Sequence, residues 1–168
     1  AYFINTFNTL SADLLYGQEP TQKFFGPIEM QMYVELADDA ISLRSFFVDL
    51  DVGQEKEYSS KEEAIASLDN FVSNNELPPP VVVDSGTGAH AYWFFNENIP
   101  VAEWKIYATK FKDFCLNNGL KIDPVVTADV ARILRCPDTF NHKTNIPTPT
   151  KVIRWSDFTS DFTVWKDF

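Results

Sequence analysis

The residues from Ser45 to Val52 constrain the fold most, because their side chains alternate with the period of a β-strand. One set of alternate residues is entirely apolar: Phe46, Val48, Leu50 and Val52. The residues between them are Phe47, Asp49 and Asp51. Successive side chains of a strand point to opposite faces of its sheet. The pattern therefore predicts a sheet with one apolar face and a second face that carries two carboxylates.

Two amphipathic helices are predicted after this strand. The first begins with a capping box at Ser60–Glu63, and its apolar residues then recur at helical spacing, so we expect about four turns that end near Asn74. The second has its apolar positions between Trp104 and Cys115 and ends at Asn118–Gly119, where glycine supports a left-handed cap. The segment Leu120–Asp123 that follows is predicted to be a short strand.

A hairpin is predicted between the two helices. The β-rich run Val81–Val83 leads into a glycine turn at Ser85–Gly88 and then into a second strand over Ala89–Phe95. Ahead of the first strand, Pro20 and the pair Gly26–Pro27 predict a loop.

The length of the chain and the spacing of these elements indicate a single domain. With 168 residues the chain can bury a core without disulfide or metal staples. We expect an α/β (α+β) fold in which helices pack on one face of a mixed sheet. The domain is predicted to span residues 1–168, with a motif-bearing core at 45–145 and peripheral elements at 1–44 and 146–168.

Composition excludes a disordered chain and gives no sign of a membrane protein. Hydrophobic residues make up 45% of the sequence and aromatic residues 15%, which is too much apolar surface for disorder. There is no apolar run of bilayer length and no leader pattern, so we expect an intracellular, cytoplasmic protein of a bacterial, archaeal or phage-infected cell. Cys115 and Cys136 lack metal-type spacing and are predicted to be buried thiols.

The net charge of -10 argues against a protein that coats nucleic acid through clustered lysine and arginine. An acidic active site would account for part of this charge, because a bound divalent ion cancels it locally. If nucleic acid is the partner, the charge predicts weak binding.

Asp49 and Asp51 are the first candidate site. Residues two apart on a strand point the same way, so both carboxylates can hold the same hard cation or a pair of cations, as two-metal phosphoryl-transfer sites require. An Asp-x-Asp pair by itself is more typical of a solvated strand face than of a metal site.

The glycine turn and His90 are the second candidate site. Backbone N–H groups in the turn, made of Ser85, Gly86, Thr87 and Gly88, can bind a triphosphate, and His90 on the following strand can donate to its oxygens. An ordinary turn followed by a half-buried histidine remains an open alternative.

The third candidate site combines Asp123 with a basic loop. A further carboxylate would complete a metal site, while Arg135 and Lys143 can bind phosphate, the arginine in bidentate fashion and the lysine as a point charge. A solvated loop with incidental ion pairs is the alternative interpretation.

The order of these three motifs resembles the pattern of the archaeo-eukaryotic primases, most closely the primase-polymerases of plasmids, phages and related mobile elements. Their third motif ends in an Arg-x-Pro-Gly-Thr-x-Asn-x-Lys-like string, which is similar to the run Arg135–Lys143 here. The resemblance spans about 100 residues, from Phe46 to Thr144. It implies an RRM-like primase core and template-directed nucleotidyl transfer, that is, DNA primase and DNA polymerase activity.

The resemblance also implies a role for each motif. Asp49, Asp51 and Asp123 would bind two Mg²⁺ or Mn²⁺ ions. His90 and the turn would bind the incoming nucleotide, and Arg135 and Lys143 would contact its phosphates. The implied partners are single-stranded DNA, ribo- or deoxyribonucleoside triphosphates, and a fused or separate helicase.

Two residues depart from the family pattern. Many members have serine two residues before the histidine, where this chain has Gly88, so any hydroxyl contact must come from Ser85 or Thr87. Asp138 replaces the usual glycine of the third motif, which affects the expected backbone geometry beside Lys143. Two cysteines cannot build the zinc insertion of some relatives.

Two functions of other classes stay open from the sequence. One is a non-catalytic nucleic-acid-binding module of a replication initiation or helicase complex, although such a binder should have a more basic surface. The other is a metal-dependent nuclease or nucleotide hydrolase, which needs the carboxylates but not the triphosphate-binding turn.

Overall fold

A computed structural model describes residues 2–4, 40–143 and 145–166, and the loop predicted at Pro20 and Gly26–Pro27 lies outside these residues. The main sheet has the strand order β2-β4-β3-β8, with every neighbouring pair antiparallel, and a short strand β9 pairs with β4 in parallel. Its strands are β2 (Ser42–Asp51), β3 (Val81–Asp84), β4 (Gly88–Pro100), β8 (Lys151–Arg154) and β9 (Thr159–Ser160).

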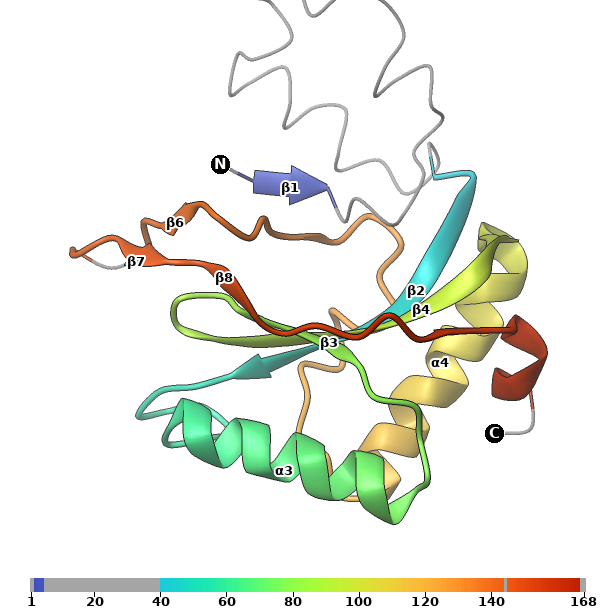
Figure 1. Cartoon of the computed structure of the whole chain (residues 1–168), viewed down its shortest axis with the longest axis horizontal. Coiled ribbons are helices and arrows are strands. Elements are labelled where there is room, and N and C mark those ends of the chain that lie inside the picture. The colour runs from blue at the N-terminus through green and yellow to red at the C-terminus, as the bar shows by residue number, and fades with distance from the viewer. Residues whose placement is uncertain (1, 5–39, 144, 167–168) are drawn as a thin grey trace, which may run out of the picture.

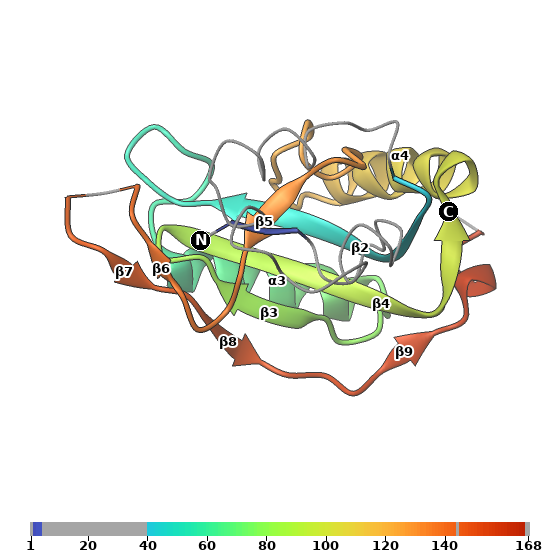
Figure 2. The same cartoon turned by 90° about the horizontal axis from the view of Figure 1, so that it is seen from above.

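Both long helices cover one face of this sheet, as Figure 1 shows, and the short strands β1 (Tyr2–Ile4) and β5 (Ile133–Arg135) lie over the other face (Figure 2). The helices are α3 (Lys61–Asn74) and α4 (Val101–Asn117), and two further short strands are β6 (Phe140–Asn141) and β7 (Thr148–Pro149). Strand β1 pairs with β5, and β6 pairs with β7. The predicted α+β fold, a mixed sheet with helices on one face, is confirmed.

The predicted start of α3 is confirmed in its main feature. Ser60 is the N-cap, and its Oγ accepts a hydrogen bond from the Glu63 N–H at 3.2 Å. The Glu63 carboxylate accepts from the N–H and hydroxyl of Ser59 instead of from Ser60 N–H, so the return bond of the capping box is shifted by one residue. Helix α4 begins three residues before Trp104, and Gly119 after it has a φ of +80°, as a left-handed cap requires.

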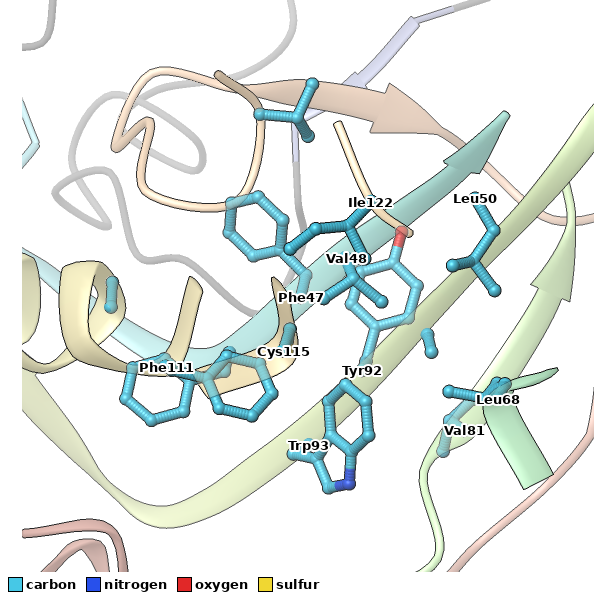
Figure 3. Packing of buried hydrophobic residues seen from close by; sticks show 14 of the residues in the cluster. Phe47, Val48, Leu50, Leu68, Val81, Tyr92, Trp93, Phe111, Cys115 and Ile122 are labelled. Carbon is cyan, nitrogen blue, oxygen red and sulfur yellow. The ribbon is translucent and has the colours of Figure 1, made fainter. Parts of the chain in front are cut away.

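The core lies between the sheet and the helices and is dominated by aromatic rings. Phe46 of β2 stacks on Phe111 of α4 with ring centroids 4.9 Å apart, and Trp93 of β4 meets the same ring edge-on at 5.2 Å (Figure 3). Trp165 contacts Phe111 at 5.6 Å from the 3₁₀ helix η3 (Phe162–Trp165). The segment after residue 146, assigned to the periphery above, thus supplies two strands of the sheet and part of the core.

The short strand predicted over Leu120–Asp123 is wrong, because this segment is irregular. Leu120 and Ile122 are buried and Lys121 is exposed, so the alternation that suggested a strand is real. The backbone bonds, however, have scattered partners. Lys121 N–H donates to the Tyr58 hydroxyl, and Asp123 N–H donates to the Asp49 carbonyl, which leaves no continuous ladder.

The two cysteines differ in burial. Cys115 is buried in α4, and burial raises the pKa of its thiol, whereas Cys136 is half-buried. The prediction of buried thiols therefore holds for Cys115 only. No helix within the described ranges combines the length and the hydrophobicity of a bilayer span.

Candidate active site

Asp49 and Asp51 face away from the helices, on the sheet surface opposite the aromatic core. In the antiparallel register Asp49 pairs with His90 and Asp51 pairs with Gly88. Directly paired residues project on the same face, so the first and second motifs meet across β2 and β4. His90 Nε2 lies 3.8 Å from Asp49 Oδ1.

Asp123 reaches the same place from a loop distant in sequence. Its N–H donates to the Asp49 carbonyl at 3.1 Å, which fixes the two residues side by side. Its Oδ1 accepts hydrogen bonds from the N–H groups of Val125 and Val126, and this stabilises the turn that follows. The third predicted aspartate thus lies beside the first through its backbone, and one of its carboxylate oxygens already serves the loop.

The electrostatics of Asp49 reflect this crowding of carboxylates. The pKa of Asp49 is raised to about 6, first by burial of the carboxyl group and next by the negative charge of Asp51. Asp123 acts in the same direction, while the guanidinium groups of Arg132 and Arg135 oppose it. Burial and the neighbouring carboxylates thus disfavour the charged form of Asp49, and a bound cation would favour it.

His90 is buried and neutral. Burial, and next the positive charges of Arg135 and Arg132, lower the pKa of its imidazole to about 3. Tyr92 Oη lies 3.4 Å from Nδ1, on the side of the ring away from Asp49. His90 can therefore donate or accept one hydrogen bond at Nε2, but it supplies no positive charge near neutral pH.

The glycine turn between β3 and β4 is closed by its own hydrogen bonds. Ser85 N–H donates to the Gly88 carbonyl, Gly88 N–H donates to Ser85 Oγ, and Gly86 N–H donates to Asp84 Oδ1. Only the Thr87 N–H of this turn has no partner recorded within the described residues. We expected the backbone N–H groups to bind phosphate, but three of the four already bond to protein, and the Ser85 side chain is buried.

Close packing explains both glycines of the turn. A Cβ on Gly86, whose φ is +91°, would lie 2.5 Å from Thr148 Oγ1, and a Cβ on Gly88 would lie 2.4 Å from the Leu50 carbonyl oxygen. Asn141 fastens the turn to β6, because its Nδ2 donates to the Ser85 carbonyl at 2.8 Å and to Thr87 Oγ1 at 3.3 Å. Of the two hydroxyls considered above, Thr87 is the more exposed.

The third motif forms a structured loop over the site. Arg135 ends β5, and its charge acts on both Asp49 and His90. Asp138 has a φ of +61°, so the position where relatives have glycine is left-handed here despite the aspartate. Lys143 is exposed, and its N–H donates to Asn141 Oδ1 at 2.9 Å.

The carboxylates fit a hard divalent cation by chemistry but do not form a ready cage. Within the described ranges, no three Asp, Glu, His or Cys side chains converge closely enough to hold one ion. Mg²⁺ is usually bound by one or two carboxylates, water and substrate phosphates, so a complete protein cage is not required. The oxygen donors of Asp49 and Asp51 on one face of the sheet fit such an ion.

One solved structure shares this arrangement of elements: the AEP domain of the primase-polymerase (PrimPol) of cyanophage S-2L. The TM-score is 0.60 over 79% of this chain and 63% of that one, with 16% sequence identity. The chain has the fold of an archaeo-eukaryotic primase domain. It spans less than two thirds of the phage domain, and at this identity the likeness concerns the fold alone. No family model matches the sequence, and no curated protein matches it either.

Three residues near the site were not singled out from the sequence as parts of it. Tyr92 Oη lies near His90 Nδ1, Asn141 holds the turn, and Lys56 binds Asp51. Arg132 belongs to the basic patch predicted together with Arg135 and Lys143, and its charge acts on Asp49. The signal for Asn141 was its place in the third motif. Lys56 carried no signal, because a lysine in a polar loop is common.

Proposed function

We propose that this domain is a nucleotidyltransferase that extends a DNA strand on a single-stranded template, as a DNA primase or DNA polymerase does. The observation that carries the proposal is the pairing of Asp49 and Asp51 with His90 and Gly88 on one sheet face. It occurs in a fold shared with a primase-polymerase domain.

Asp49, Asp51 and Asp123 are the proposed ligands for two Mg²⁺ or Mn²⁺ ions. When bound, such ions activate the attacking 3′-hydroxyl and neutralise charge on the leaving pyrophosphate. Two observations support this proposal: β2 directs Asp49 and Asp51 to one face of the sheet, and a backbone hydrogen bond joins Asp123 to Asp49.

Arg135 and Lys143 are the proposed phosphate contacts, and Arg132 joins them. Among the described residues Arg132 Nε is buried without a hydrogen-bond partner. A buried donor left unpaired costs free energy, which a phosphate oxygen would recover. Because His90 is neutral, the positive charge for the triphosphate must come from these arginines and from Lys143.

His90 and Thr87 are the proposed neutral contacts to the nucleotide. His90 Nε2 lies on the side of the ring that faces Asp49, so a hydrogen bond from it would reach an oxygen that lies next to the carboxylates. Thr87 contributes its N–H and hydroxyl from the turn. Ser85, Gly86 and Gly88, which were expected to bind the nucleotide, are proposed instead to hold the shape of the turn, since their N–H groups already have protein partners.

Template extension is the experiment that tests the function. The protein is incubated with a primed single strand, Mn²⁺ and labelled nucleotides, with deoxyribo- and ribonucleotides supplied in parallel. We expect extension that is lost in Asp49→Ala and Asp51→Ala and retained in the exposed control Asp113→Ala. Cleavage of the strand would indicate a nuclease, and retention of the strand without chemistry would indicate a binding module.

Template affinity is expected to be weak because few cations are available on a chain of net charge -10. If only the basic residues around Arg135 and Lys143 contact phosphates, the slope of log affinity against log salt should have a magnitude of about 2 to 4. Fluorescence anisotropy with a labelled strand at several salt concentrations measures this slope. Tight binding with a steep slope would contradict the expected weak affinity and would indicate a basic groove separate from the acidic residues. Weak binding would favour a helicase, fused or separate, as the partner that retains the template.

A further inference from the structure

Lys56 is a cation that the protein itself supplies to the acidic site. Its Nζ donates to Asp51 Oδ2 at 2.8 Å. Asp51 is one of the three carboxylates proposed to bind metal, so this ammonium group already occupies part of the proposed metal site.

The loop that carries Lys56 is built to hold it in place. Gly53 N–H donates to the Tyr58 carbonyl at 3.0 Å, and Lys56 N–H donates to the Gly53 carbonyl at 3.2 Å, so the loop closes on itself. Tyr58 anchors its base: the ring is buried, and the hydroxyl donates to Ser67 Oγ and accepts from Lys121 N–H. Lys56 is thus presented from a fixed backbone directly after β2, unlike an ordinary surface lysine.

Gly53 leaves the space that the lysine stem occupies. A Cβ built at position 53 would lie 3.3 Å from Lys56 Cγ, closer than ordinary van der Waals contact. The side chain of Lys56 therefore passes over Gly53 on its way to Asp51.

We infer that Lys56 is the resident counterion of Asp51 and that it competes with the divalent cation for this carboxylate. Binding of the ion then requires the ammonium to leave Asp51, so Lys56 lowers the affinity of the site for the ion. The competition rests on the proposed metal site, whereas the counterion role rests on the contacts above. The two parts are tested separately.

Calorimetric titration of the protein with Mn²⁺ tests the competition. Lys56→Met keeps the stem and removes the charge, and we expect it to bind Mn²⁺ about fivefold more tightly, the factor that corresponds to a surface ion pair. Lys56→Arg keeps the charge and should bind like the wild type. Lys105→Met, an equal loss of charge on the exposed side of α4, is the control and should also bind like the wild type.

Equal or weaker Mn²⁺ binding by Lys56→Met would overturn the competition. If the wild type and all variants fail to bind Mn²⁺, the proposed metal site fails, and the competition fails with it. Thermal unfolding without metal then decides the counterion role. Lys56→Met should lower Tm by about 1–3 °C, and adding Asp51→Asn should recover it, because the unpaired carboxylate is removed. Additive effects of the two substitutions would overturn the counterion role.

Discussion

The strand pair β2–β4 presents opposite chemistry on its two faces. On the helix side, Phe46 and Trp93 pack against Phe111 with ring centroids about 5 Å apart. On the other side, the half-buried Asp49 lies next to the buried His90. Burial of aromatic rings stabilises the fold, whereas burial of a carboxylate opposes it. Neighbouring residues of one strand should therefore change stability in opposite directions when they are replaced.

The largest effect is expected on the helix face. Phe46→Ala should lower the free energy of unfolding by about 3–5 kcal/mol, because it removes a ring at the centre of the aromatic cluster and leaves a cavity. Denaturant unfolding measures the loss. Phe140→Ala, at a phenylalanine that is 55% exposed, should change the free energy by less than about 0.5 kcal/mol. Similar losses in the two variants would show that the cluster does not dominate stability.

The next effect concerns the close approach of the glycine turn to β2. Gly88→Ala would place a Cβ 2.4 Å from the Leu50 carbonyl oxygen, which is backbone and cannot rotate away. We expect a loss of about 3 kcal/mol from this overpacking. Gly119→Ala is the contrast, because nothing lies within 4 Å of its Cβ and only the left-handed backbone resists, at about 1 kcal/mol. Equal losses would mean that the turn shifts freely.

A gain of stability is expected on the opposite face. Asp49→Asn should stabilise the metal-free protein at pH 8 by about 3 kcal/mol, since the pKa of Asp49 is raised from 3.8 to about 6 and each unit corresponds to about 1.4 kcal/mol. The folded state favours the protonated carboxyl of Asp49, so the wild type loses the stability that this proton provides as the pH rises through 6. The difference between variant and wild type should therefore shrink below pH 6 and vanish below about pH 4.

Unfolding curves between pH 3.5 and 8, recorded with a chelator, measure this difference. Asp113→Asn, an exposed aspartate on α4, should show no comparable dependence on pH. A variant that is less stable than the wild type at pH 8 would show that the arginines neutralise Asp49 completely, and the argument for a cation at this site would lose its electrostatic support.

The smallest effect is expected at Asp138, in the loop over the site. Its φ of +61° is in the left-handed region, where an aspartate destabilises the folded protein and a glycine does not. Asp138→Gly should therefore stabilise the protein by about 0.5–1 kcal/mol. Glu76→Gly, at a residue with a φ of +52° after α3, should give a similar gain away from the site. A loss at Asp138 alone would show that its side chain stabilises the loop.

Features encoded by neighbouring residues were predictable. The cap of α3 at Ser60, the hairpin around residues 85–88 and the shared face of Asp49 and Asp51 all depend on periodicity and turn chemistry within a few residues. The same reasoning failed at Leu120–Asp123, because alternating burial arose from packing while its hydrogen bonds went to scattered partners. The local sequence pattern does not reveal which groups will accept hydrogen bonds from the backbone of a segment.

The sequence alone determined strands β2, β3 and β4 of the main sheet, the two carboxylates on one face of β2 and the order of three motifs. Only the tertiary structure decided that Asp123 lies beside Asp49, that His90 is buried and therefore neutral, and that Lys56 neutralises Asp51. Distance and burial between segments far apart in the chain set these properties. The charge state of a side chain depends on its burial from solvent and on the charges near it in the folded protein. The adjacent residues in the sequence do not reveal either property.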